Sequence, residues 1–191
     1  MIIFYYLWVL FIKLDKIMFK PIFDKLVVPI TEEMINLAKI DAESLKSSIG
    51  QKTRNATELR DITGSLAHQA VEKAFKEMGR PFISYRLERR TTGDRGDIKY
   101  ENDLIDVKGQ KKIWNNQFLV FDNEMESIER KGITHFCFVE VNYGQREAYI
   151  YGVIDVYDFK NKSIPVKLKW DNHAIYIKDL KPFINYVNRS N

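Results

Sequence analysis

Apolar residues recur at helical spacing in two segments of the first half of the chain. The first segment, residues 31–49, has Glu32 and Glu33 in its first turn and is followed by Gly50. The second segment, residues 59–78, repeats Leu, Ile, Ala and Met at intervals of three and four and ends at a Gly-Arg-Pro sequence. Both spacings gather the apolar side chains on one face, so both segments are predicted as helices that pack on a core.

The period of the apolar residues changes to two after Pro81, which is typical of strands that bury one face. Strands are predicted at residues 83–87, 97–100, 103–108, 117–121, 133–141, 147–154, 166–170 and 174–177, and a short helix at residues 122–131. Residues 171–173 are expected as the turn of the last hairpin. This order of elements predicts an α/β or α+β domain with a mixed central sheet flanked by helices.

The length of 191 residues fits one domain with an appended arm. Residues 1–56 are expected to form a hydrophobic arm and a helix, and residues 57–191 the core domain. Met1–Ile12 is uncharged and strongly hydrophobic, but a membrane span needs about 20 residues. It also lacks the basic start and small-residue cleavage site of a signal peptide. A packing arm, or a true start at Met18, is expected, with membrane association as the alternative.

Composition narrows the class of protein. The 45% of hydrophobic residues excludes a disordered or collagen-like chain, and a single cysteine, Cys137, excludes a disulfide framework or a four-cysteine iron–sulfur site within one chain. The net charge of +4 is compatible with a polyanionic partner. Abundant Lys, Ile and Asn suggest an AT-rich genome, and we expect a cytoplasmic protein of a microbial or virus-infected cell, without a stable membrane partner.

The residues that are candidates for catalysis or metal binding lie on the predicted hairpin around Glu101-Asn102. A two-residue loop there makes Asp97 face Asp106, and directly opposed residues point to the same face of a sheet. Lys108 lies two residues beyond Asp106 and shares that face. A loop at Asn102-Asp103 would leave the acids diagonal on one face, whereas a three-residue loop would put them on opposite faces.

Two opposed carboxylates destabilise a sheet unless something compensates their charge, and Lys108 compensates only part of it. A hard divalent cation would offset the rest, because Mg²⁺ is held by one or two carboxylates together with waters and phosphate oxygens. The alternative is an ordinary cluster of surface ion pairs. The hairpin alone favours neither interpretation.

Motifs on either side of the hairpin resemble those of a known family. Gly96-Asp97-Ile98 and Ile105–Gln110 (IDVKGQ) resemble the signature of the PD-(D/E)xK nuclease superfamily, in which an acid on one strand is followed by acid-x-Lys on the next. Upstream, Gly64–Glu72 (GSLAHQAVE) resembles the G-x-x-x-H-x-x-x-E helix of the RecB-type branch. The resemblance covers about residues 59–121, and the motifs stand in the family's order.

The resemblance implies a restriction-endonuclease-like fold and a Mg²⁺-dependent deoxyribonuclease, with Mn²⁺ as a substitute. Lys108 would orient the attacking water or stabilise the pentacoordinate transition state, and Gln110 would position the phosphate or the lysine. Glu72 is an alternative functional acid to His68. The implied metal ligands are Asp97, Asp106, the main-chain carbonyl of Val107, and His68; the implied catalytic residues are Asp97, Asp106, Lys108, Gln110 and Glu72.

Basic and aromatic residues flank the hairpin and would contact DNA through its backbone phosphates. These residues are Arg86, Arg89, Arg90, Arg95, Lys111, Lys112 and Trp114. Trp114 could stack on an unpaired base, while a solvated basic rim is the simpler alternative. A homodimer fits double-strand cleavage, which needs two sites. The alternatives to a nuclease are a catalytically inactive nucleic-acid-binding or scaffold protein of the same fold and an unrelated α/β enzyme.

Overall fold

The computed structural model describes residues 25–48, 58–86 and 96–189 as a mixed α and β domain. The strands are β1 (Leu26–Pro29), β2 (Ile83–Ser84), β3 (Ile98–Tyr100), β4 (Asp103–Gln110), β5 (Gln117–Phe121), β6 (His135–Asn142), β7 (Glu147–Asp155), β8 (Ile164–Lys167) and β9 (Asp171–Tyr176). The helices are α2 (Glu32–Ser48), α3 (Glu58–Glu77), α4 (Asp122–Lys131), α5 (Val156–Lys162), α6 (Phe183–Val187) and the short 3-10 helix η2 (Ile177–Asp179).

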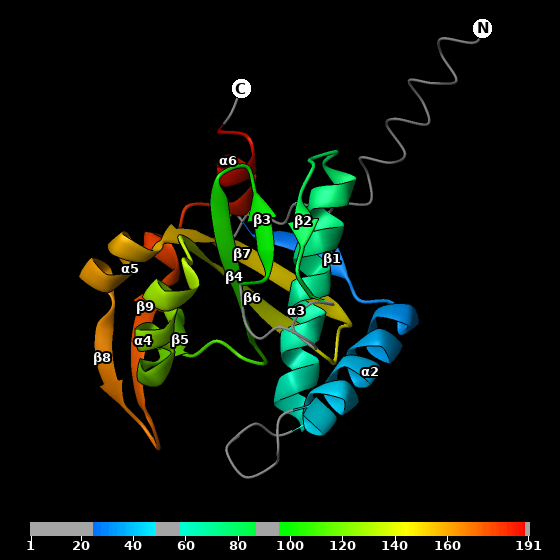
Figure 1. Ribbon diagram of the computed structural model, residues 1–191, viewed down its shortest axis with the longest axis horizontal. Coiled ribbons are helices and arrows are strands. Elements are labelled where there is room, and N and C mark those ends of the chain that lie inside the picture. The colour runs from blue at the N-terminus through cyan, green and yellow to red at the C-terminus, as the bar shows by residue number, and fades with distance from the viewer. Residues whose placement is uncertain (1–24, 49–57, 87–95, 190–191) are drawn as a thin grey trace, which may run out of the picture.

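Within the described residues, six strands form one sheet in the order β1-β7-β6-β4-β3-β2, and three form a second in the order β5-β9-β8. In the large sheet β4 and β6 pair parallel, and the other neighbouring strands pair antiparallel. Figure 1 shows the smaller sheet with α4 and α5 on one side of the larger sheet, and α3 and α2 on the other. The predicted mixed sheet flanked by helices is therefore confirmed.

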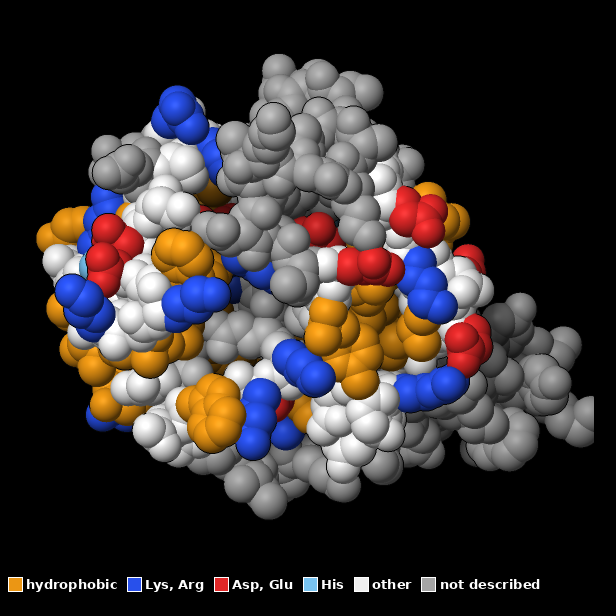
Figure 2. All heavy atoms as spheres, turned by 90° about the horizontal axis from the view of Figure 1, so that it is seen from below, with side chains coloured by type: hydrophobic (Ala, Val, Ile, Leu, Met, Phe, Trp, Pro, Cys, Tyr) orange, Lys and Arg blue, Asp and Glu red, His pale blue; other side chains and the backbone are white. Residues whose placement is uncertain are grey.

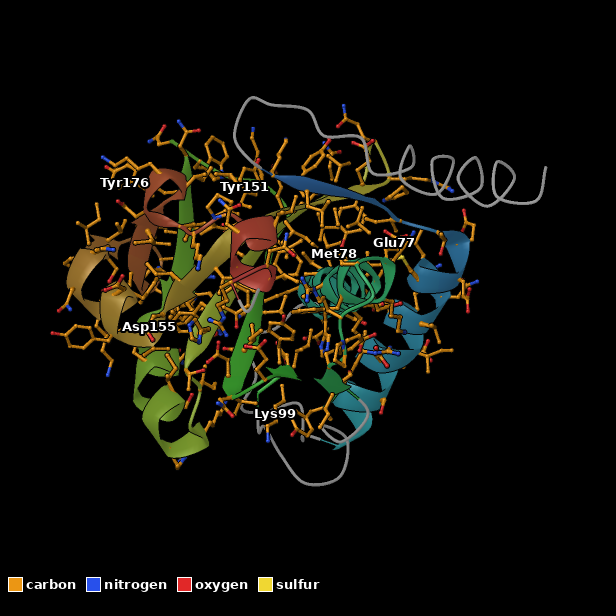
Figure 3. The ribbon with its side chains drawn as sticks, turned by 90° about the horizontal axis from the view of Figure 1, so that it is seen from above. Glu77, Met78, Lys99, Tyr151, Asp155 and Tyr176 are labelled. Carbon is orange, nitrogen blue, oxygen red and sulfur yellow. The ribbon has the colours of Figure 1, made fainter. Side chains whose placement is uncertain are left out.

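Strand β6 is apolar on both faces because both faces of the large sheet are covered. Phe136 and Phe138 are fully buried in the core formed with β5, α4, α5 and β9. Cys137 and Val139 point the other way, into the core formed with α3, β1 and α6. Figure 3 looks nearly along α3, with Glu77 and Met78 at its C-terminal end, α2 on one side of it and strands on the other.

Helix α3 lies very close to β4 at Gly109. A Cβ atom added there would be 2.6 Å from the Cβ of Ala67 and 3.0 Å from the main-chain oxygen of Thr63. Only a glycine permits this approach without a shift of helix or strand. The contact fixes the distance between β4 and the face of α3 that carries His68.

Several expectations from the sequence are wrong in detail. The turn of the β8–β9 hairpin lies at residues 168–170 rather than 171–173, and His173 is part of β9. Of the predicted strand 83–87 the structure describes residues 83–86, of which only 83–84 form a strand, and Ile83 is 54% exposed rather than buried. Strand β1 and helices α5 and α6 were not predicted, because each is too short to show a clear period.

Strand β1 and helix α2 lie within the segment expected as an arm and a helix. β1 pairs with β7 in the large sheet, and α2 contributes Met34 and Ala38 to the core under α3. These two elements therefore share one hydrophobic core with the segment 57–191, whereas Met1–Ile12 lies outside the described residues. No helix in the described ranges is long and apolar enough to cross a membrane.

Candidate functional site

The hairpin of β3 and β4 has the two-residue loop that the sequence predicted. Ile98 pairs with Ile105 and Tyr100 with Asp103, and Glu101 turns the chain at a φ of 54°. The paired register ends at Ile98 and Ile105, so it does not include the expected pairing of Asp97 with Asp106. The N–H of Asp97 donates instead to the carbonyl of Ile105.

The carboxylate of Asp97 accepts a hydrogen bond of the kind that a main-chain carbonyl accepts in a regular strand pair. Its Oδ2 accepts the main-chain N–H of Val107 at 2.6 Å, and the residue is fully buried. Gly96 makes this geometry accessible with a φ of 97°, which side-chain-bearing residues rarely adopt. The Asp97 carboxylate is therefore fixed against β4 at the peptide that joins Asp106 to Val107.

Asp106, Lys108 and Gln110 alternate along β4 with residues that face the α3 core. The Nζ atom of Lys108 is 2.7 Å from Oδ2 of Asp106 and 2.5 Å from Oε2 of Glu124 on α4. The side-chain amide of Gln110 donates to the carbonyl of Leu119 on β5 at 2.8 Å. This face of β4 thus holds one ammonium between two carboxylates.

The environment of Lys108 keeps it protonated. Burial alone would lower its pKa, but the charges and hydrogen bonds of Asp106 and Glu124 outweigh burial and raise the pKa above its ordinary value. Lys108 is therefore a fixed cation at neutral pH, which suits it to stabilise negative charge rather than to accept a proton.

A second group of polar side chains lies buried between α3, β2 and β3. His68 is 1% exposed, with Nε2 3.4 Å from Oε1 of Glu72 and Nδ1 3.8 Å from Oδ1 of Asp97. The hydroxyl of Ser84 donates to Glu72 and lies 3.4 Å from Nε2 of His68. The helix spacing of four residues brings His68 and Glu72 together, as the sequence predicts for one face of α3.

A cleft of about 1190 Å³ opens beside these groups, between α3, β4, α4 and the turn after β6. Asp106, Lys108, Gln110 and His68 line it, whereas Asp97 and Glu72 are not among its lining residues. Figure 2 shows the molecule from below, with Lys and Arg side chains gathered around the middle of that face. The structure thus brings Asp106, Lys108 and Gln110 together on the cleft and connects them to Asp97 through Val107.

Part of the predicted DNA-contacting set lies on the same cleft. Arg86, Lys111, Lys112 and Trp114 line it, although Arg86 is paired with Asp41 at 2.8 Å. Trp114 is 66% exposed, with the Lys112 ammonium 4.3 Å from the centre of its ring. The predicted contacts at Arg89, Arg90 and Arg95 lie outside the described residues.

Arg60 and Glu124 are among the charged residues of the cleft that sequence reasoning missed. They form an ion pair of 3.2 Å between α3 and α4, although 64 positions separate them along the chain. Glu124 is in the first turn of an amphipathic helix, and Arg60 is near the start of another. Neither position belongs to a motif, so only the folded arrangement reveals them.

The donor atoms fit a hard divalent ion better than a transition metal. Among the described residues, no group of three or more His, Cys, Asp and Glu side chains is gathered so as to hold a metal ion. Mg²⁺ commonly needs only one or two protein carboxylates and takes waters and phosphate oxygens as its other ligands. Asp106 and Asp97, which adjoin the same stretch of β4, supply carboxylates of that kind.

Comparison of the chain with protein-family models, curated proteins and solved structures gives no match. Function is therefore inferred from the geometry of the cleft and from the motifs in the sequence.

Proposed function

We propose that this protein is a Mg²⁺-dependent deoxyribonuclease with a restriction-endonuclease-like fold, which hydrolyses phosphodiester bonds in the cleft. The observation that carries the proposal is the ion pair of Asp106 and Lys108 on the cleft, next to the Val107 N–H that binds the buried carboxylate of Asp97. This is the acid and acid-x-Lys arrangement of the PD-(D/E)xK signature, with the G-x-x-x-H-x-x-x-E helix beside it.

Asp97, Asp106 and the main-chain carbonyl of Val107 would hold Mg²⁺ or Mn²⁺, with His68 as a further donor. When bound, such an ion activates water and neutralises charge on phosphate oxygens. Water attacks phosphorus and gives up a proton to solvent, the bond from phosphorus to the leaving sugar oxygen breaks, and that oxygen takes up a proton from solvent. No covalent enzyme intermediate forms.

The remaining side chains of the site have positioning and electrostatic roles. Lys108, held as a cation, stabilises the extra negative charge of the pentacoordinate phosphorus. Gln110 is anchored on the Leu119 carbonyl, which fixes its amide at the cleft, and Glu72 orients His68 from behind. Lys111, Lys112 and Trp114, which line the cleft, would contact the DNA partner. A homodimer would supply two sites for double-strand cleavage.

The test is cleavage of plasmid and single-stranded DNA by the purified chain with Mg²⁺ or Mn²⁺. The wild type is expected to cleave, and Asp106→Asn to lose at least about 100-fold in rate. Asp158→Asn is the matched control, because it removes a carboxylate from an exposed ion pair on α5. An inactive wild type whose Mn²⁺ binding is unaffected by Asp106→Asn would remove the nuclease proposal.

A catalytically inactive nucleic-acid-binding protein of the same fold is the second candidate. It is favoured by Lys108, whose charge is already matched by Asp106 and Glu124. That protein would bind DNA as well with EDTA as with Mg²⁺ and would cleave nothing in either condition.

A further inference from the structure

The carboxylate of Glu124 is held between cations from two different elements. Its Oε2 is 2.5 Å from Nζ of Lys108 on β4, and its Oε1 is 3.2 Å from a terminal nitrogen of Arg60 on α3. The Arg60 guanidinium also lies 4.4 Å from the ring centre of Phe121. All four residues line the cleft. A phosphodiester likewise presents two equivalent oxygens to two cations.

We propose that Arg60 and Lys108 form a binding site for one phosphodiester group of a nucleic acid, and that Glu124 occupies this phosphate site until the nucleic acid displaces it. The inference rests on the proposed function in one respect, the choice of DNA as the anion. It assigns Arg60 to substrate binding and gives Glu124 the role of a competing internal anion.

The contacts around Lys108 show where the bound phosphate would lie. Lys108 also contacts Asp106 at 2.7 Å, and this ion pair remains when a phosphate replaces Glu124. The exchange therefore keeps Lys108 between two anions and keeps it protonated. It also brings the phosphate next to Asp106, the residue proposed to act in hydrolysis.

The displacement of Glu124 breaks two ion pairs of different exposure. The pair with Arg60 joins side chains that are 46% and 30% exposed, so it is weak. The pair with Lys108, whose side chain is 16% exposed, is replaced by a pair between Lys108 and the phosphate. The main chain of Glu124 is held separately, because its carbonyl accepts the hydroxyl of Ser127 at 2.8 Å. The carboxylate can therefore leave the phosphate site while α4 stays in place.

The experiment measures binding of a short fluorescent oligothymidylate in EDTA, so that no cleavage is needed. Glu124→Gln is expected to lower the Kd several-fold, because it removes the competing anion. In an Arg60→Gln background the same change should give much less gain, since the phosphate site is then incomplete. Asp61→Asn is the matched control, because Asp61 lines the same cleft next to Arg60.

Removal of the Asp61 carboxylate should tighten binding equally in both backgrounds, through its general effect on charge. Unfolding in urea is measured for every variant to establish that each one is folded. An unchanged or higher Kd for Glu124→Gln, or a gain independent of Arg60, overturns the phosphate site. If the gain from Glu124→Gln depends on Arg60 but the protein does not cleave DNA, only the proposed function is wrong. If the protein cleaves DNA but the gain does not depend on Arg60, only the phosphate site is wrong.

Discussion

The charge of Lys108 decides which chemistry this side chain can perform. Two carboxylates hold its pKa above the ordinary lysine value, so it stays protonated well beyond neutral pH. Lys108→Met should therefore lower kcat for a single-stranded oligonucleotide by about 100- to 1000-fold, as expected for loss of a transition-state cation. Lys162→Met, which removes the exposed partner of Asp158, is the control and should keep the wild-type rate. Wild-type kcat in Lys108→Met would contradict this role.

Asp103 has a structural role that its pKa makes testable. Burial alone would raise this pKa, but hydrogen bonds from Tyr186 and Arg189 and the charge of His135 lower it overall. A lowered pKa in the folded state means that stability is present above pH 4 and is lost as the pH falls through the folded value. We expect Asp103→Asn to cost about 1–3 kcal/mol at pH 7 and much less at pH 3.

Urea unfolding of both proteins at the two pH values measures that difference for Asp103→Asn. The control is Asp158→Asn, which should change stability by no more than about 0.5 kcal/mol at either pH. A cost for Asp103→Asn that is the same at pH 3 and pH 7 would mean that the Asp103 charge is not what stabilises the fold.

Single residues of the site were predictable where a local period fixes their direction. Strand alternation correctly gave Asp106 and Lys108 a common face, and the two-residue loop gave the register from Tyr100 to Ile98, but not the expected pairing of Asp97 with Asp106. The hydrogen bond from Val107 to the Asp97 side chain was not predictable, because it depends on the φ of Gly96 and on a break in the ladder. Glu124 was missed because its role depends on a contact between distant elements.

The contact between α3 and β4 depends on the small size of Gly109. Gly109→Ala would drive a Cβ into Ala67 and the main chain of Thr63, so we expect a loss of about 1–3 kcal/mol in urea unfolding. Gly64→Ala is the matched control on α3, because nothing lies within 4 Å of its added Cβ. It should stabilise the helix by about 0.5–1 kcal/mol. Equal effects of the two changes would contradict the close approach.

Elements were predicted well where they are long and amphipathic. The spacing in α3 and the continuous apolar run of β6 gave their types and approximate ends. The seven-residue α5 was missed because its main signal is local: the Asp155 side chain accepts the N–H groups of Tyr157 and Asp158. The β8–β9 turn was misplaced by three residues, because Asp171-Asn172-His173 has turn composition but belongs to β9.

At the scale of the whole molecule, the cleft brings together residues that are far apart along the chain. α3 covers one face of the large sheet, α4 and β5 lie toward the other, and β4 runs between them (Figure 1). Arg60 and Glu124 meet across this space from opposite layers. The sequence predicted the layers from apolar periods, but their spacing is set by contacts such as that at Gly109, which no period encodes.

The DNA contacts proposed for Lys111, Lys112 and Trp114 should depend on salt in different ways. Each Lys that contacts a phosphate contributes about 0.7 to the slope of log K against log salt for single strands. Lys111→Gln with Lys112→Gln should therefore reduce that slope by about 1.4, if both contact phosphates. Trp114→Ala should weaken binding by about 1–3 kcal/mol at every salt concentration, because base stacking releases no counterions. Fluorescence anisotropy with a single-stranded oligonucleotide in EDTA measures both effects. An unchanged slope in the lysine variant, with Trp114→Ala also binding as the wild type does, would show that DNA does not contact these residues.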